Sequence, residues 1–179
     1  DHCYVLSSSG TTGRRKLVPL GHRQLIAYAR AIAERLALGH DDIGVHLMPM
    51  HFGHGLIGNM LTPMAAGAAL VLWPEPGPAG LPVLGKVIDE HGVSFMSSVP
   101  SLWRVATRLS LRPERGTLRR VHVGSAPLAA PAMRARARAY VQNVIDCTGS
   151  QRDLLRSVDA MVGQLSPGTL RKLRVFHVL

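Results

Sequence analysis

Near its amino end the chain reads Ser7-Ser8-Ser9-Gly10-Thr11-Thr12-Gly13-Arg14-Arg15-Lys16, directly after the apolar segment Tyr4-Val5-Leu6. Glycine permits backbone conformations that bring consecutive N–H groups close to a ligand, and such groups form a concave site for anions. The hydroxyls add hydrogen-bond donors, and the three basic residues add positive charge. The stretch therefore predicts a loop that binds a polyphosphate. A flexible Ser/Gly-rich linker is the alternative interpretation of this composition.

The spacing of this loop differs from that of two common phosphate-binding motifs. A P-loop needs Gly-x-x-x-x-Gly-Lys-Ser/Thr, whereas Gly10 and Gly13 are too close together and Lys16 does not follow a glycine. The dinucleotide pattern Gly-x-Gly-x-x-Gly is also absent from the loop. The loop instead resembles the signature loop of the acyl-adenylate-forming superfamily, which includes acyl-CoA synthetases, luciferases and the adenylation domains of peptide synthetases. That loop reads Ser/Thr-Ser-Gly-Thr-Thr-Gly-x-Pro-Lys-Gly; Arg15 replaces its Pro and Leu17 its final Gly.

Two later segments extend the resemblance. Residues 49–56, Pro-Met-His-Phe-Gly-His-Gly-Leu, resemble a His/aromatic-Gly segment that the superfamily carries at a similar interval after its loop. Residues 124–128, Gly-Ser-Ala-Pro-Leu, match the Gly-Gly/Ser-Ala-Pro-Leu segment in type and order. This second segment follows a predicted strand, and open α/β sheets bind ligands outside the carboxyl ends of their strands. A purely structural turn is the alternative at this position.

The resemblance implies a role for each matching segment. In the superfamily the loop holds the β- and γ-phosphates of ATP, the 124–128 segment borders adenine, and the His/aromatic segment lines the carboxylate pocket. The expected catalytic residues are Lys16, as a charge on the departing pyrophosphate, and the hydroxyl donors Thr11 and Thr12. The expected ATP-binding residues are Ser8, Ser9, Gly10, Thr11, Thr12, Gly13, Lys16, Gly124, Ser125, Ala126 and Pro127. The expected pocket residues are His51, Phe52 and His54.

The implied reaction is ATP-dependent activation of a carboxylic acid. It forms an acyl-adenylate and then a thioester with coenzyme A or with the phosphopantetheine of a carrier protein. Magnesium is implied as the companion of ATP, but no metal ligand is predicted in the sequence. Zinc binding by His51 and His54 would need further ligands, which the neighbouring sequence does not provide.

The resemblance weakens after residue 143. The superfamily continues with Asn-x-Tyr-Gly-x-Thr-Glu, whereas residues 143–149 read Asn-Val-Ile-Asp-Cys-Thr-Gly and supply neither the adenine-stacking Tyr nor the magnesium-binding Glu. We expect residues 1–146 to be a partial AMP-binding domain and residues 147–179 to be a divergent or frameshifted tail. The chain is then an incomplete and inactive fragment of the enzyme's large N-terminal domain. A degenerate, non-catalytic nucleotide-binding or interaction module is the alternative function.

Short apolar runs alternate with amphipathic stretches along the chain, which predicts an α/β fold. The expected architecture is a partial parallel sheet with helices on both faces. Strands are predicted over residues 4–8, 45–48, 69–73, 93–99, 120–124 and 141–146. Helices are predicted over residues 22–38, 56–66, 81–91, 101–109 and 129–140, with Gly21 as an N-cap and Gly39 ending the first of them.

Composition narrows the choice of partners. The net charge of +10 is typical of nucleic-acid-binding proteins. The arginines are scattered, however, and no aromatic residues interleave them for base stacking, so no nucleic acid partner is predicted.

Residues 43–74 contain no charged side chain other than histidine. Because Pro49, Asn59 and Pro63 interrupt this run, it predicts a buried helix and strand and no membrane span. The two cysteines, Cys3 and Cys147, have no CxxC spacing, so neither a disulfide framework nor a zinc site is predicted; we expect both as small core residues in a cytoplasmic protein.

Overall fold

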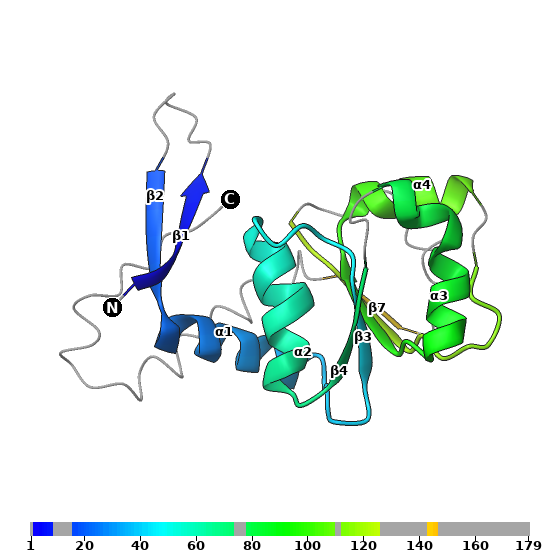
Figure 1. The fold of residues 1–179 in the computed structure, drawn as a ribbon, viewed down its shortest axis with the longest axis horizontal. Helices are drawn as coiled ribbons and strands as arrows, with labels where there is room; N and C mark the ends of the chain where they lie inside the picture. Colours follow the sequence, from blue (N-terminus) through cyan, green and yellow to red (C-terminus); the bar gives the residue numbers. More distant parts are fainter. Residues whose placement is uncertain (1, 9–15, 74–77, 110–111, 126–142, 147–179) are drawn as a thin grey trace.

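The computed structural model describes residues 2–8, 16–73, 78–109, 112–125 and 143–146 (Figure 1). Within these residues the strands form a two-stranded sheet and a five-stranded sheet. The strands are β1 (His2–Ser8), β2 (Lys16–Gly21), β3 (Ile43–His46), β4 (Ala69–Leu72), β5 (Phe95–Ser98), β6 (Arg120–Val123) and β7 (Asn143–Asp146). The helices are α1 (His22–Arg35), η1 (His54–Leu61), α2 (Thr62–Ala65), η2 (Pro78–Val83), α3 (Leu84–His91) and α4 (Pro100–Arg108). The predicted helix over 129–140 lies outside the described residues.

The larger sheet confirms the predicted α/β class. Its strand order is β4-β3-β5-β6-β7, and every neighbouring pair is parallel. All four residues of β5 are buried, as expected for a central parallel strand that is covered on both faces. After β3 the chain continues to β4 on one side, whereas after β5 it continues to β6 on the other side. The carboxyl ends of β3 and β5 therefore form a topological switch point, the place where open α/β sheets bind ligands.

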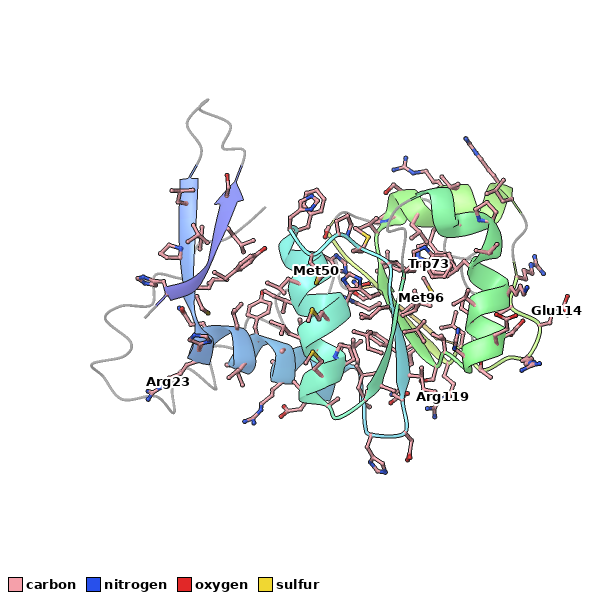
Figure 2. All side chains as sticks on the ribbon, in the orientation of Figure 1. Arg23, Met50, Trp73, Met96, Glu114 and Arg119 are labelled. Atoms are coloured by element: carbon pink, nitrogen blue, oxygen red, sulfur yellow. The ribbon has the colours of Figure 1, made fainter. Side chains whose placement is uncertain are left out.

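Helices cover both faces of this sheet, as predicted. Met96 and Trp73 belong to one core, which β3, β5 and β6 form with α3 and α4 (Figure 2). Phe95, next to Met96 in β5, belongs to a second core with Leu25 and Ile32 of α1 and with η1. Because successive strand residues point to opposite faces, these two adjacent residues of β5 anchor the two helical layers.

The amino-terminal hairpin was not predicted. Strands β1 and β2 pair antiparallel, with Ser8 opposite Lys16, so residues 9–15 connect the two paired ends. The predicted strand over 4–8 is therefore confirmed, but it belongs to a separate two-stranded sheet. Cys3 was expected in the core; it is exposed on β1, because a two-stranded sheet buries little of its surface.

Several element boundaries differ from the predicted ones. Helix α1 ends with Leu36 as its C-cap, three residues before Gly39, and Ala37 takes the left-handed conformation (φ 48°) that was expected of the glycine. The helix predicted over 56–66 begins two residues earlier as the π-helix η1 and continues as α2. The helix predicted over 81–91 is the 3-10 helix η2 followed by α3. Among the described helices, none has the length and apolarity needed to cross a membrane.

Candidate functional site

Four polar side chains form a continuous hydrogen-bonded chain at the carboxyl edge of the parallel sheet. His54, the first residue of η1, places its Nε2 2.7 Å from Ser97 Oγ and its Nδ1 2.8 Å from Ser125 Oγ. Ser97 Oγ also lies 2.6 Å from Nδ1 of His122. Ser97 and His122 are register partners on β5 and β6, and Ser125 follows β6. We call these residues, His122, Ser97, His54 and Ser125, the histidine–serine relay.

The π-helical start of η1 holds His54 at the switch point. The helix follows β3 through a tight turn in which the Phe52 N–H donates to Pro49 O (3.1 Å). Asn59 is buried in η1, and its Oδ1 accepts the N–H of Leu47 at 3.1 Å, which ties the helix to the end of β3. Short π-helical segments occur frequently at functional sites, because the wider turn redirects side chains at the helix end.

Gly55 is the residue that permits this tight turn. A Cβ at position 55 would lie 2.1 Å from Pro49 O and 2.8 Å from Met48 O, both backbone atoms that no side-chain motion can relieve. The turn before η1 therefore requires a residue without a side chain, since only glycine lets the two backbones approach so closely.

We expect Gly55→Ala to displace the start of η1 and to disrupt the relay. Overpacking typically costs about 1–3 kcal/mol of folding free energy and occasionally more. Urea denaturation would measure this loss, and the NMR signals of the His54 ring would report the displacement. Gly39→Ala is the matched control, because a Cβ there meets nothing within 4 Å. A Gly55→Ala variant with the stability and the His54 signals of the parent would show that the turn before η1 does not require glycine at this position.

The segment after β6 brings an unusual backbone conformation to the site. Ser125 has φ 68°, in the left-handed region that residues other than glycine rarely adopt. The Gly124 N–H donates to Ser98 O (3.1 Å), which fastens this segment to the end of β5. Conformations of this kind cluster at ligand-binding and active sites. Ser125 is also exposed, so its hydroxyl is accessible from outside.

The two histidines of the relay are held in their neutral form. Burial, together with the smaller effect of the nearby His54, lowers the pKa of His122 to about 3. Burial also lowers the pKa of His54 below its usual value. At neutral pH the relay therefore offers neutral hydrogen-bond donors and acceptors and no positive charge.

The structure brings together some of the predicted site residues. His54, Gly124 and Ser125 meet at the sheet edge: a Cβ at Gly124 would lie 3.4 Å from His54 Cε1. His51 and Phe52 lie before η1 with their rings 4.2 Å apart, and the Phe52 side chain is 53% exposed. The Tyr4 hydroxyl donates to His51 O at 3.3 Å, so the hairpin contacts this turn. Ser8 and Lys16 are the paired hairpin ends. The other predicted site residues, Ser9, Gly10, Thr11, Thr12, Gly13, Ala126 and Pro127, lie outside the described residues.

Comparison with known proteins assigns the family. The family described as AMP-binding enzyme matches residues 1–150. The chain belongs to the AMP-binding enzyme family. The human mitochondrial malonate–CoA ligase is 35% identical over 74 residues, which are 41% of this chain and 13% of that protein. The salicyl-AMP ligase/salicyl-S-ArCP synthetase of Mycobacterium tuberculosis is 33% identical over 120 residues, 60% of this chain and 20% of that protein.

A solved structure agrees with this assignment. The apo structure of Mycobacterium smegmatis MbtA superposes with a TM-score of 0.63 and 34% sequence identity, and the match covers 76% of this chain and 24% of that chain. This AMP-binding chain thus spans a quarter or less of the length of the relatives compared here. The resemblance inferred from the loop and from residues 124–128 is confirmed at the level of the family.

Two residues of this AMP-binding chain's site were missed in the sequence. Ser97 and His122 lie inside predicted strands, where we assigned them no role. The neighbouring Ser98 has a structural part: its Oγ accepts the Nε1–H of the buried Trp103 at 2.7 Å. The available signal was the presence of polar residues near the carboxyl ends of two predicted strands, Ser97 and Ser98 in β5 and His122 in β6. The sequence does not reveal that these two residues are neighbours, because it does not show the strand register.

Proposed function

We propose that this chain supplies the phosphate-binding hairpin and part of the carboxylate-activating edge of an ATP-dependent acid–thiol ligase. The observation that carries the proposal is the meeting of His54, Gly124 and Ser125 at the switch point of a parallel sheet. Membership in the AMP-binding family supports it. The names of the two relatives support both possible thiol acceptors, coenzyme A for the malonate ligase and a carrier protein for the salicyl enzyme.

The proposed reaction has two steps. A carboxylate oxygen attacks the α-phosphorus of ATP, which forms the acyl-adenylate as the bond to pyrophosphate breaks. A thiol of coenzyme A or phosphopantetheine then attacks the acyl carbon, loses its proton and releases AMP. Positioning and charge stabilisation supply most of the catalysis in reactions at phosphorus.

Each proposed site residue has a part in binding or positioning. The loop between β1 and β2, with Ser9, Gly10 and Gly13, would surround the β- and γ-phosphates. Thr11, Thr12 and Lys16 would donate hydrogen bonds and positive charge to the departing pyrophosphate. The backbone of residues 124–127 would border the adenine ring. His51, Phe52 and His54 would line the pocket of the acid.

Magnesium would accompany ATP in this reaction. Among the described residues there is no group of three or more His, Cys, Asp or Glu side chains that could hold a metal ion. We therefore assign no residue to the metal and no step to it.

We also propose that this chain by itself binds ATP weakly and forms no adenylate. Residues 143–149 carry neither the Tyr nor the Glu of the superfamily pattern. The expected result is no carboxylate-dependent exchange between ATP and labelled pyrophosphate. Exchange by the purified chain would contradict this part of the proposal.

Nucleotide binding tests the site itself. We expect millimolar ATP at moderate salt to shift backbone amide NMR signals of residues 8–16 and 124–125, and Lys16→Ala to weaken the binding about tenfold, because a charge-assisted hydrogen bond to phosphate is lost. Arg23→Ala is the control, since Arg23 points into solvent from the first turn of α1 (Figure 2). Shifts elsewhere, or none at all, would overturn the proposed site. Salt-sensitive binding of an oligonucleotide, with no response to ATP, would indicate a nucleic-acid-binding protein instead.

A further inference from the structure

His122 is a partly buried side chain of the relay that the proposed function does not use. Ser97 connects His122 to His54, because its hydroxyl lies between the two histidine rings at 2.6 and 2.7 Å. The rings themselves are 5.3 Å apart between centroids and inclined at 44°. These distances are those of hydrogen bonds between oxygen and nitrogen.

Two glycines lie next to the rings of the relay. A Cβ at Gly58 would lie 3.0 Å from His54 Cδ2 and 3.2 Å from Ser97 Oγ. On the other side, a Cβ at Gly124 would lie 3.4 Å from His122 Nε2 and from His54 Cε1. A side chain at position 58 would therefore crowd His54 and Ser97, whereas a Cβ at position 124 would be in ordinary contact with the two rings.

The single proton of the Ser97 hydroxyl couples the two rings. A neutral imidazole has one protonated and one bare nitrogen, and among the described residues the structure gives Ser97 Oγ no third partner. If Ser97 donates to His122 Nδ1, it must accept from His54, so both rings carry their proton on Nε2. If Ser97 donates to His54 Nε2, it must accept from His122, so both rings carry their proton on Nδ1. The two histidines therefore share one tautomer.

We propose that His122 is a positioning residue which, through Ser97, fixes the tautomer of His54. The tautomer of His54 in turn determines what Ser125 presents at the sheet edge. When His54 Nδ1 is protonated it donates to Ser125 Oγ, and the Ser125 proton is available for an anionic oxygen. When His54 Nδ1 is bare it accepts the Ser125 proton, and Ser125 presents only an acceptor. That Ser125 faces an anionic oxygen rests on the proposed function. The coupling of the two rings does not depend on that function.

The test is the tautomer of each histidine in the full chain without nucleotide, so its result is independent of the proposed function. Chains labelled with ¹⁵N-histidine give well-separated NMR shifts for protonated and bare ring nitrogens at pH 7.5. We expect the same tautomer for His54 and His122 in the parent. In His122→Phe, which keeps a flat ring without its nitrogens, the His54 signals should move toward a mixture of tautomers. In His122→Asn, whose amide can replace Nδ1 as a partner of Ser97, a single His54 tautomer should return.

Controls separate this role from a structural one. His46→Phe removes a buried histidine on β3 that does not belong to the relay, and it should leave the His54 ring signals unchanged. Amide spectra would establish that each variant is folded; if His122→Phe does not fold, Ser97→Ala breaks the same connection. Unlike tautomers in the parent, or unchanged His54 signals in a folded His122→Phe or Ser97→Ala chain, would overturn the proposal.

Discussion

Asp42→Ala is expected to lower the free energy of unfolding by about 3 kcal/mol, the lower end of the range for breaking a buried ion pair, because the Asp42 side chain is buried while its partners Arg120 and Arg119 are 16% and 50% exposed. The Asp42 side chain is buried and accepts from Arg119 Nη2 and Arg120 Nη2, each at 2.9 Å. Its Oδ1 also accepts the Ser94 hydroxyl at 2.6 Å. Arg120 in turn donates to Leu36 O at the end of α1 (2.7 Å). The carboxylate thus joins the end of α1, the start of β5 and the start of β6.

The measurement is urea denaturation at pH 7, with Asp41→Ala as the control. Asp41 is the neighbouring acid; its side chain is 87% exposed and contacts only the exposed His40 among the ion pairs of the described residues. We expect the free energy of unfolding of Asp41→Ala to lie within about 0.5 kcal/mol of that of the parent, as is usual for surface substitutions. An Asp42→Ala variant as stable as Asp41→Ala would contradict the role of this carboxylate.

The pH dependence of the Asp42 contribution has a definite sign. Burial raises the pKa of Asp42, but the hydrogen bonds from Ser94 and Gly39 and the charges of Arg120 and Arg119 outweigh burial, so the net pKa is lowered. A lowered carboxyl pKa stabilises the fold above the pKa of the unfolded chain, and this stability is lost as the pH falls through the folded value. The stabilising contribution of Asp42 is therefore fully present at pH 7, and its change with pH is confined to values below about 4.

The second large effect is a loss of stability between neutral pH and pH 4.5, caused by His122. Its pKa is about 3 in the folded chain and about 6.5 when unfolded. Between these two values the unfolded chain binds one more proton than the folded chain, so stability falls by about 1.4 kcal/mol per pH unit as the pH is lowered. From pH 7 to pH 4.5 this single residue should cost roughly 2–3 kcal/mol.

Urea denaturation of the parent and of His122→Phe at several pH values between 7 and 4.5 measures this contribution. The variant cannot be protonated at position 122, so its stability should depend less on pH by the amount given above. Burial also lowers the pKa of His46, whose buried Nε2 has no hydrogen-bond partner within the described part of the chain. In the double variant that also carries His46→Phe, the free energy of unfolding should therefore depend less on pH than in either single variant. Equal pH slopes for the parent and His122→Phe would refute the buried neutral state of this ring.

Helices and strands were predicted correctly from the sequence where the period of apolar residues matches the period of the element that they form. The β-like run over 93–99 and the amphipathic run over 22–38 each gave an element of the right type, because burial of one face imposes the period of the pattern. The order of strands and helices also indicated a parallel sheet with helices on both faces. The loop near the amino end and residues 124–128 indicated the AMP-binding family.

Boundaries were predicted less well, and for identifiable reasons. Gly39 is a good terminator by propensity, yet α1 ends earlier because Leu36 is buried against the second core and Ala37 turns the chain there. The hairpin partner β2 contains Pro19 and lacks a clear alternation, so its pairing with β1 was not visible. The π-helical turn at His54 depends on the close approach of Gly55 to Pro49, a contact between backbones that no sequence period reports.

The amino-acid sequence alone determined the fold class and the family, since these depend on residue types at fixed spacing. The tertiary structure decided that Ser97 and His122 belong with His54 and Ser125. Ser97 and His122 are 25 residues apart in the sequence, and the register of β5 on β6 brings them together. His54 and Ser125 are 71 residues apart, and the turn that follows β3 brings His54 to Ser125. Hydrogen bonds act over about 3 Å, so which polar residues cooperate is fixed when the strands are aligned, and that alignment comes from the packing of the whole sheet.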